Sequence, residues 1–178
     1  MELTEKILDT KDIFEGHVYK VKVHSIEQPD GSPATREVVL HNGGVGVIAV
    51  DENGMVPMVR QFRTAANIVT LEIPAGKLEK GENPYDAGMR ELTEETGYVT
   101  EGLIELGEYF ATPAYCSEKL TLYMAKDLEF KGQSLDDGEF LNVEKIHIDD
   151  LFEMVMNNEI YDCKTAIAIL KAKAMLDK

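Results

Sequence analysis

The chain has 178 residues, of which 44% are hydrophobic and 29% charged, which is typical of one globular domain or of a domain with a small appendage. Its 18 Lys and Arg residues against 33 Asp and Glu residues give a net charge of −15, so we expect no nucleic-acid partner, because phosphate backbones require a cationic surface. The clearest apolar run, at 45–50, is far shorter than the ~20 residues of a transmembrane helix, so we expect no membrane span.

An acidic chain can still bind a phosphorylated small molecule if divalent cations or placed arginines offset the repulsion between like charges. Cys116 and Cys163 form no CxxC pair, so a zinc site is not expected. A single disulfide and two reduced thiols both remain open, and the thiols are the simpler interpretation. The N-terminus lacks the basic-then-apolar pattern of a signal peptide, which predicts a cytoplasmic location.

The first part of the chain reads as β-structure. Strand-like stretches at 17–25 and 34–40 flank a dense cluster of turn formers at 28–33, which predicts a β-hairpin. The apolar runs 45–50 and 55–60 flank Asn53-Gly54, and this pattern predicts a second hairpin. The remaining predicted strands follow at 69–74, 104–111, 120–125 and 141–148.

The main predicted helix runs from Pro84 to about Thr96. Asn83 is a suitable N-cap, proline suits the first helical position, and Gly97 is a natural end. An apolar stripe is expected on this helix, formed by Tyr85, Met89 and Leu92. With two further helices at about 149–157 and 161–176, the pattern predicts an α+β fold. We divide it into an N-terminal β-rich segment, 1–42, and a main domain, 43–178.

Three glutamates on the main helix form a candidate metal site. At about 100° per residue, Glu91, Glu94 and Glu95 fall at roughly 0°, 300° and 40°, on one side of the helix. Their repulsion would be relieved by Mg²⁺ or Mn²⁺, which prefer hard oxygen ligands. The alternative is a solvated acidic face on a surface helix. The preceding loop, at 71–76, could bring backbone carbonyls to the same place, and Glu82 could pair with Arg90 to hold the loop against the helix.

The stretch 76–98 resembles the Nudix box, G-x5-E-x7-R-E-U-x-E-E-x-G-U, where U is apolar. Every fixed position matches, and the only departure is Tyr98 at the last, usually aliphatic, position. The resemblance implies an α/β/α sandwich around a mixed sheet that hydrolyses a nucleoside diphosphate linked to another moiety. It assigns the metal ligands to Glu91, Glu94, Glu95 and the carbonyl of Ala75. It assigns structural roles to Gly76, Glu82, Arg90 and Gly97.

Segments outside the box resemble the ADP-sugar pyrophosphatase branch of the family, especially ADP-ribose pyrophosphatase. They lie at 36–44, 59–63 and 71–76, with a proline, Pro113, fifteen residues beyond the box. The resemblance implies hydrolysis of ADP-ribose to AMP and ribose 5-phosphate. Substrate contacts are implied for Arg36, Arg60 and Glu72. The alternatives are ion pairs for the two arginines and a solvated strand-end carboxylate for Glu72.

The same branch implies an acidic residue on a loop before a late strand that orients or deprotonates the attacking water. Glu139, after the acidic loop 136–138, matches that position best. A solvated acidic loop is the alternative, and the water could instead be activated by the metal alone or by a box glutamate such as Glu94. The resemblance also implies a homodimer that exchanges the N-terminal β segment. Other nucleoside diphosphate sugars, other pyrophosphates and a non-catalytic ADP-ribose sensor are the competing functions.

Overall fold

The computed structural model describes residues 2–135 and 138–178. The chain forms two compact units, Met1–Gly43 with Phe110–Lys119, and Gly44–Tyr109 with Leu120–Lys178. Residues 110–119, which the sequence suggested as part of the main domain, therefore group with the N-terminal segment. In the part of the chain that the structure describes, no helix is long and apolar enough to cross a membrane.

The smaller unit is built on a three-stranded antiparallel sheet, ordered β1-β2-β3. Its strands are β1 (Lys6–Glu15), β2 (Tyr19–Glu27) and β3 (Pro33–His41). The hairpin predicted around 28–33 is confirmed as β2 and β3. Strand β1 was not predicted, and its register shows why: irregularities at Ile7/Asp9 and Asp12/Phe14 break the alternation by which a strand is recognised.

The larger unit contains a mixed four-stranded sheet, a three-stranded sheet and a two-stranded ladder. The four-stranded sheet has the order β7 (Ala75–Lys77), β4 (Gly44–Ala49), β10 (Lys119–Ala125) and β9 (Leu103–Phe110). The three-stranded sheet has the order β12 (Leu141–His147), β5 (Met55–Arg63) and β6 (Ile68–Glu72). The ladder joins β11 (Glu129–Phe130) to β8 (Tyr98–Val99). The helices are α1 (Pro84–Thr96), α2 (Ile148–Met156) and α3 (Cys163–Leu176).

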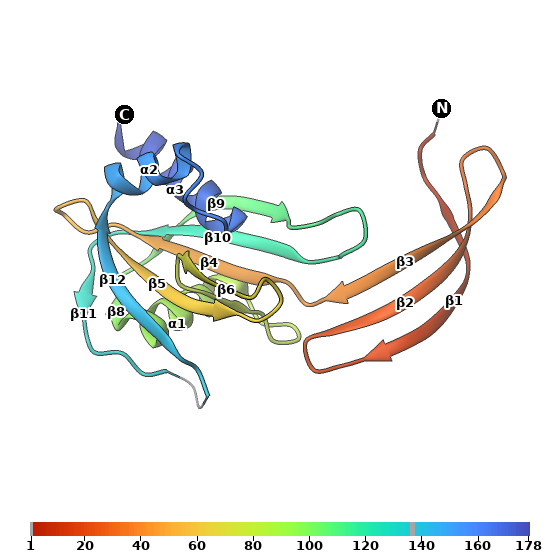
Figure 1. Ribbon diagram of the computed structural model, residues 1–178, viewed down its shortest axis with the longest axis horizontal. Helices are drawn as coiled ribbons and strands as arrows, with labels where there is room; N and C mark the ends of the chain where they lie inside the picture. Colours follow the sequence, from red (N-terminus) through yellow and green to blue (C-terminus); the bar gives the residue numbers. More distant parts are fainter. Residues whose placement is uncertain (1, 136–137) are drawn as a thin grey trace. The chain divides into compact units, whose positions relative to one another are not determined.

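Strand β4 lies between two hydrophobic clusters. Because side chains alternate across a strand, Val45 and Val47 pack with Leu92 of α1, whereas Ile48 packs with α2 and α3, including Ile169. Within the larger unit this gives helix layers on the two faces of the sheets, α1 on one and α2 and α3 on the other (Figure 1). The α/β/α sandwich expected from the Nudix resemblance is confirmed.

The second predicted hairpin is wrong. Asp51–Gly54 do form a turn, with Asp51 N–H donating to the Met55 carbonyl at 3.0 Å. However, β4 pairs with β7 and β10, whereas β5 pairs with β6 and β12. The turn therefore passes the chain from one sheet to another, and a local Asn-Gly signal cannot distinguish the two outcomes because partner choice depends on contacts far along the chain.

Candidate active site

Helix α1 is capped at both ends by Asn83 and Gly97, the residues from which its limits were predicted. The Asn83 side chain accepts a hydrogen bond from Tyr85 N–H at 2.9 Å, and Gly97 adopts a left-handed φ of 76°. Its buried stripe differs from the predicted one: the buried residues are Ala87, Gly88, Glu91, Leu92, Glu95 and Thr96. Tyr85 is 37% exposed. Two of the box carboxylates therefore lie on the packed face of the helix and not on the opposite one.

Glu91 and Glu95 are buried carboxylates in an unfavourable environment. Glu95 is 3% exposed, and its Oε2 accepts a hydrogen bond from Ala75 N–H at 2.9 Å. Burial, together with the charges of Glu91 and Glu139, raises the pKa of Glu95 to about 8. Burial also raises the pKa of Glu91, and the charges of Glu94 and Glu139 add to this shift. Both carboxylates would gain from a cation placed between them.

Gly76 allows the close approach of strand β7 to helix α1. A Cβ atom built on Gly76 would lie 1.7 Å from Glu91 Oε1, so any other residue at this position would force the Glu91 carboxylate to move. The glycine of the box therefore leaves space for a carboxylate, and the backbone around Ala75 and Gly76 contacts both buried glutamates.

Arg90 forms ion pairs with three acidic side chains of the box. Its Nη1 lies 2.8 Å from Glu94 Oε2 and 2.9 Å from Glu91 Oε1, and its Nη2 lies 3.2 Å from Glu82 Oε1. The predicted Glu82–Arg90 ion pair is therefore present. It ties the loop before α1 to the helix, and Glu79 N–H donates to Glu82 Oε2 at 2.8 Å within that loop.

Glu139 lies near the box glutamates. It lines a cavity of about 340 Å³ together with Glu95 of α1, Gln61 and Phe62 of β5, and Phe140, which precedes β12. Its charge contributes to the raised pKa values of Glu91 and Glu95. The two aspartates of the predicted acidic loop, at 136 and 137, lie outside the described residues.

The three predicted substrate contacts have other partners in this structure. Arg36, in the smaller unit, donates through Nε to Glu5 at 3.2 Å. Arg60 lies on β5 with Nε 2.6 Å from Glu144 Oε1 on β12. Glu72 is 1% exposed and is therefore neither a solvated carboxylate nor open to a ligand in this arrangement.

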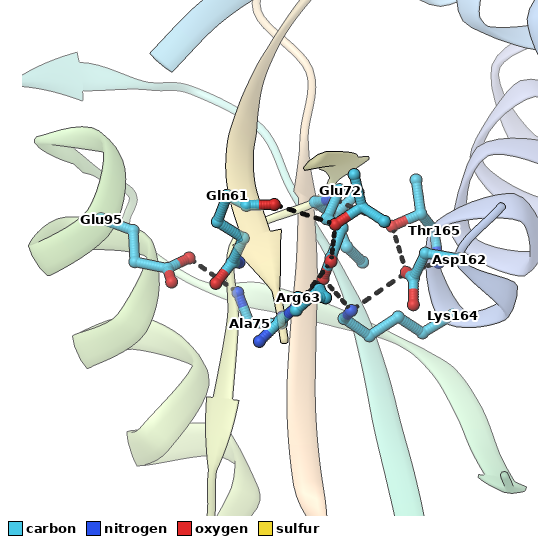
Figure 2. A network of polar contacts seen from close by, with 10 residues as sticks. Gln61, Arg63, Glu72, Ala75, Glu95, Asp162, Lys164 and Thr165 are labelled. Carbon is cyan, nitrogen blue, oxygen red and sulfur yellow. Dashed lines mark hydrogen bonds and ion pairs between the residues drawn. The ribbon is translucent and has the colours of Figure 1, made fainter. Parts of the chain in front are cut away.

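Arg63 is a site residue that sequence reasoning did not single out. Its Nε and Nη2 donate to the two oxygens of Glu72, at 2.8 and 2.7 Å, while its side chain remains 42% exposed. The charges of Glu72 and Glu95 raise the pKa of Arg63. Figure 2 shows Glu95 on α1 at the left and Glu72 toward α3 at the right, with Gln61, Ala75 and Arg63 between them. The only signal in the sequence was that Arg63 lies within the segment 59–63, which resembles the ADP-sugar pyrophosphatase branch.

The donor set fits a hard divalent cation, although it is not assembled around one. In the part of the chain that the structure describes, no three acidic, His or Cys side chains converge on one point at metal-binding distance. Glu91 and Glu94 instead share Arg90. Buried carboxylates with raised pKa values are nevertheless the oxygen ligands that Mg²⁺ and Mn²⁺ prefer. Binding by all three requires Glu94 and Glu91 to turn from Arg90.

A model of the NUDIX domain family matches residues 40–163. The chain belongs to the Nudix hydrolase family. Hydrolases of this family generally depend on divalent metal ions, which agrees with the oxygen donors on α1. The family assignment also accounts for the spacing of the box, because each of its charged residues has a contact in the structure that depends on that spacing.

Curated relatives span nearly the whole chain. An ADP-ribose pyrophosphatase from Bacillus subtilis is 39% identical over 94% of this chain and 91% of its own length. A methanol dehydrogenase activator from Bacillus methanolicus is 40% identical, over 93% and 90%. The crystal structure of an ADP compounds hydrolase superposes with a TM-score of 0.85, covers 99% of this chain and 97% of its own, and is 20% identical, which supports the fold alone.

Proposed function

We propose that this chain hydrolyses ADP-ribose to AMP and ribose 5-phosphate, with Mg²⁺ as the cofactor and Mn²⁺ as a possible substitute. The observation that carries the proposal is the pair of buried, mutually repelling carboxylates, Glu91 and Glu95, beside a cavity that Glu139 also lines. The choice of substrate is supported by the 39% identity to a protein named ADP-ribose pyrophosphatase.

The metal would be held by Glu91, Glu94, Glu95 and the carbonyl of Ala75. When bound, such a cation neutralises diphosphate oxygens and lowers the pKa of a coordinated water. The chain's own contribution is to keep these ligands on a capped helix against the Gly76 backbone. Burial makes Glu91 and Glu95 poor anions without the cation, so these two carboxylates are poised to bind it.

Glu139 is proposed to take a proton from the attacking water. It lies in the cavity with Glu95, and within residues 2–135 and 138–178 no hydrogen bond holds its side chain, so its carboxylate is available as an acceptor. Water attacks one phosphorus, the bond from that phosphorus to the bridging oxygen breaks, and the proton ends on the departing phosphate. General-base assistance of this kind contributes about 10²–10⁴-fold.

Arginines are proposed to bind the phosphates. Arg63 is the best placed of the three arginines. Its guanidinium is fixed by the ion pair with Glu72, its side chain is still accessible to solvent, and its charge interacts with that of Glu95. Arg60 and Arg36 remain candidates, and contact with substrate would require each to leave its present partner, Glu144 or Glu5. Glu72 acts on the substrate only through Arg63.

The decisive experiment is an ADP-ribose hydrolysis assay in Mg²⁺ with identification of both products. The Glu95→Gln variant should lose at least about 100-fold in turnover, because metal-based charge stabilisation supplies several kcal/mol and each ~1.4 kcal/mol is tenfold in rate. Glu101→Gln, at an exposed glutamate beyond the helix, is the control and should retain wild-type turnover. Comparable activity in the two variants would contradict the metal assignment.

A second candidate is hydrolysis of another nucleoside diphosphate sugar or another pyrophosphate. It is favoured by the relative that is 40% identical but is named for activation of a dehydrogenase and not for ADP-ribose. A substrate panel at equal concentration separates the candidates. Slow release of AMP from ADP-ribose beside fast turnover of another sugar nucleotide would select the second.

We also propose that the chain is a homodimer that pairs through its N-terminal sheet. All ten residues of β1 are exposed within the smaller unit, and they include Ile7, Leu8, Ile13 and Phe14, each more than half exposed. An edge strand with four large, exposed apolar side chains is an unfavourable surface for a monomer.

A further inference from the structure

We propose that Lys164, in the first turn of helix α3, is a positioning residue that holds Arg63 in place for the diphosphate of the substrate. The inference rests on the proposed function, because it requires a substrate with a diphosphate. Lys164 lies far along the chain from the Nudix box at 76–98, and one residue beyond the segment that matches the family model.

The contact between Lys164 and Arg63 runs through Glu72. Glu72 Oε1 accepts hydrogen bonds from Arg63 Nε at 2.8 Å and Thr70 Oγ1 at 2.5 Å, and Oε2 accepts from Arg63 Nη2 at 2.7 Å. Lys164 Nζ forms a further ion pair with Oε2. Glu72 is 1% exposed and Lys164 is 8% exposed, so their pair is shielded from water. Glu72 is fixed from one side by α3 and presents its two oxygens to Arg63 on the other (Figure 2).

Lys164 is itself fixed by the N-cap of α3. Asp162 Oδ2 lies 3.0 Å from Lys164 Nζ and also accepts from Thr165 N–H at 2.9 Å and from Thr165 Oγ1 at 2.6 Å. The N-cap is therefore also the second anion of the network. Arg63, Lys164, Glu72 and Asp162 together carry two positive and two negative charges, so the buried network is balanced only when Lys164 is present.

The same turn of α3 also contacts the loop that reaches the metal-binding carboxylates. Thr165 Oγ1, which is fully buried, accepts a hydrogen bond from Ile73 N–H at 3.0 Å. Two residues further along, Ala75 N–H donates to Glu95 at 2.9 Å. The segment 72–75 thus contacts α3 through Ile73 and the box helix α1 through Ala75. Both Arg63 and Glu95 depend on the position of this segment.

Without Lys164, the buried carboxylate of Glu72 would have Arg63 as its remaining cation. We expect Arg63, which already pairs with both oxygens of Glu72, to be held there more strongly and to offer less of its charge to the diphosphate, because a buried charge that loses one partner compensates with the other. The substrate would then lose an anchored arginine contact. A hydrogen bond to a charged group contributes about 1.5–3 kcal/mol, which corresponds to a weakening of roughly 10- to 100-fold.

The test is a double-mutant cycle on KM and kcat for the substrate that the panel identifies. Lys164→Met and Arg63→Met should each raise KM at least about tenfold. If Lys164 acts through Arg63, the double variant should be no worse than Arg63→Met alone. Lys171→Met removes an exposed lysine of the same helix and is the control for a simple loss of charge; its KM should equal that of the wild type.

A structural role would give another result. If Lys164 only stabilised the fold, Lys164→Met would lower the melting temperature and the active fraction, which reduces kcat and leaves KM unchanged. That result, or additive effects in the double variant, would overturn the proposal. Thermal unfolding of all variants identifies the first case, and Lys164→Arg, which retains the charge, should recover KM in part. Absence of ADP-ribose turnover in the wild type would contradict the proposed function and leave the cycle to be run on the substrate found.

Discussion

Glu72 and Glu95 are both almost fully buried, yet their pKa values move in opposite directions. Arg63, Lys164 and Thr70 counteract the burial of Glu72 and lower its pKa to about 2. Glu95 has one backbone donor and two acidic neighbours, and its pKa rises to about 8. The first carboxylate is satisfied by the folded chain, whereas the second requires something that the chain does not supply.

This difference predicts how the stability of the metal-free protein depends on pH. A carboxyl whose pKa is raised by folding contributes stability below its unfolded pKa, 4.5, and loses it as the pH rises through about 8. We therefore expect the melting temperature in chelator to fall between pH 5 and pH 8. Thermal unfolding across this range is the measurement. Glu95→Gln should flatten the profile, and an equal slope in that variant would contradict the assignment.

The roles of single residues were predictable only where they depended on local spacing. Glu91, Glu94 and Glu95 share one side of a helix whatever the rest of the chain does, and Glu82 reaches Arg90 within one loop. Lys164 contacts Glu72 across 92 positions of sequence, so no local pattern could indicate it. Glu72 was predicted at a strand end, but its burial follows from the position of α3.

At the scale of elements, the limits of α1 could be read from the sequence, while its buried face could not. Caps act on the adjacent turn, so Asn83 and Gly97 identify the ends directly. The apolar residues Tyr85 and Met89 suggested a buried stripe that lies to one side of the actual one, because the small residues of α1 pack against β4 and two of its carboxylates against β7. An active-site helix breaks the usual rule that charged side chains face solvent.

The packing of β7 against α1 predicts a sharp effect of Gly76→Ala. The new Cβ would occupy the position of the Glu91 carboxylate, so Glu91 must leave the place where a metal would bind. We expect loss of at least about tenfold in metal affinity, measured by calorimetric titration with Mn²⁺. Gly102→Ala is the matched control, because its Cβ would meet only the Tyr85 hydroxyl at 3.3 Å. Equal affinities in the two variants would contradict this account.

At the scale of the whole molecule, the exposed strand β1 predicts a dimer that charge can disrupt. Ile7→Lys combined with Ile13→Lys should shift the protein from dimer to monomer in light scattering, because each change replaces an apolar side chain of the proposed interface by a charge that pairing would have to bury. Asp9→Lys, at a position on the same strand that is already polar, should leave the dimer intact. A monomeric wild type would rule out the interface, while an unchanged dimer in the double variant would place it elsewhere.

The contacts of α3 have a consequence for how the protein can be shortened. The segment that matches the family model ends at residue 163, one position before Lys164. A chain cut there would keep every letter of the Nudix box, yet it would lose the amine that faces Glu72 and the hydroxyl that receives Ile73 N–H. Such a fragment would still contain the whole segment that matches the family model, yet it would lack the support behind Arg63, the arginine proposed to bind phosphate.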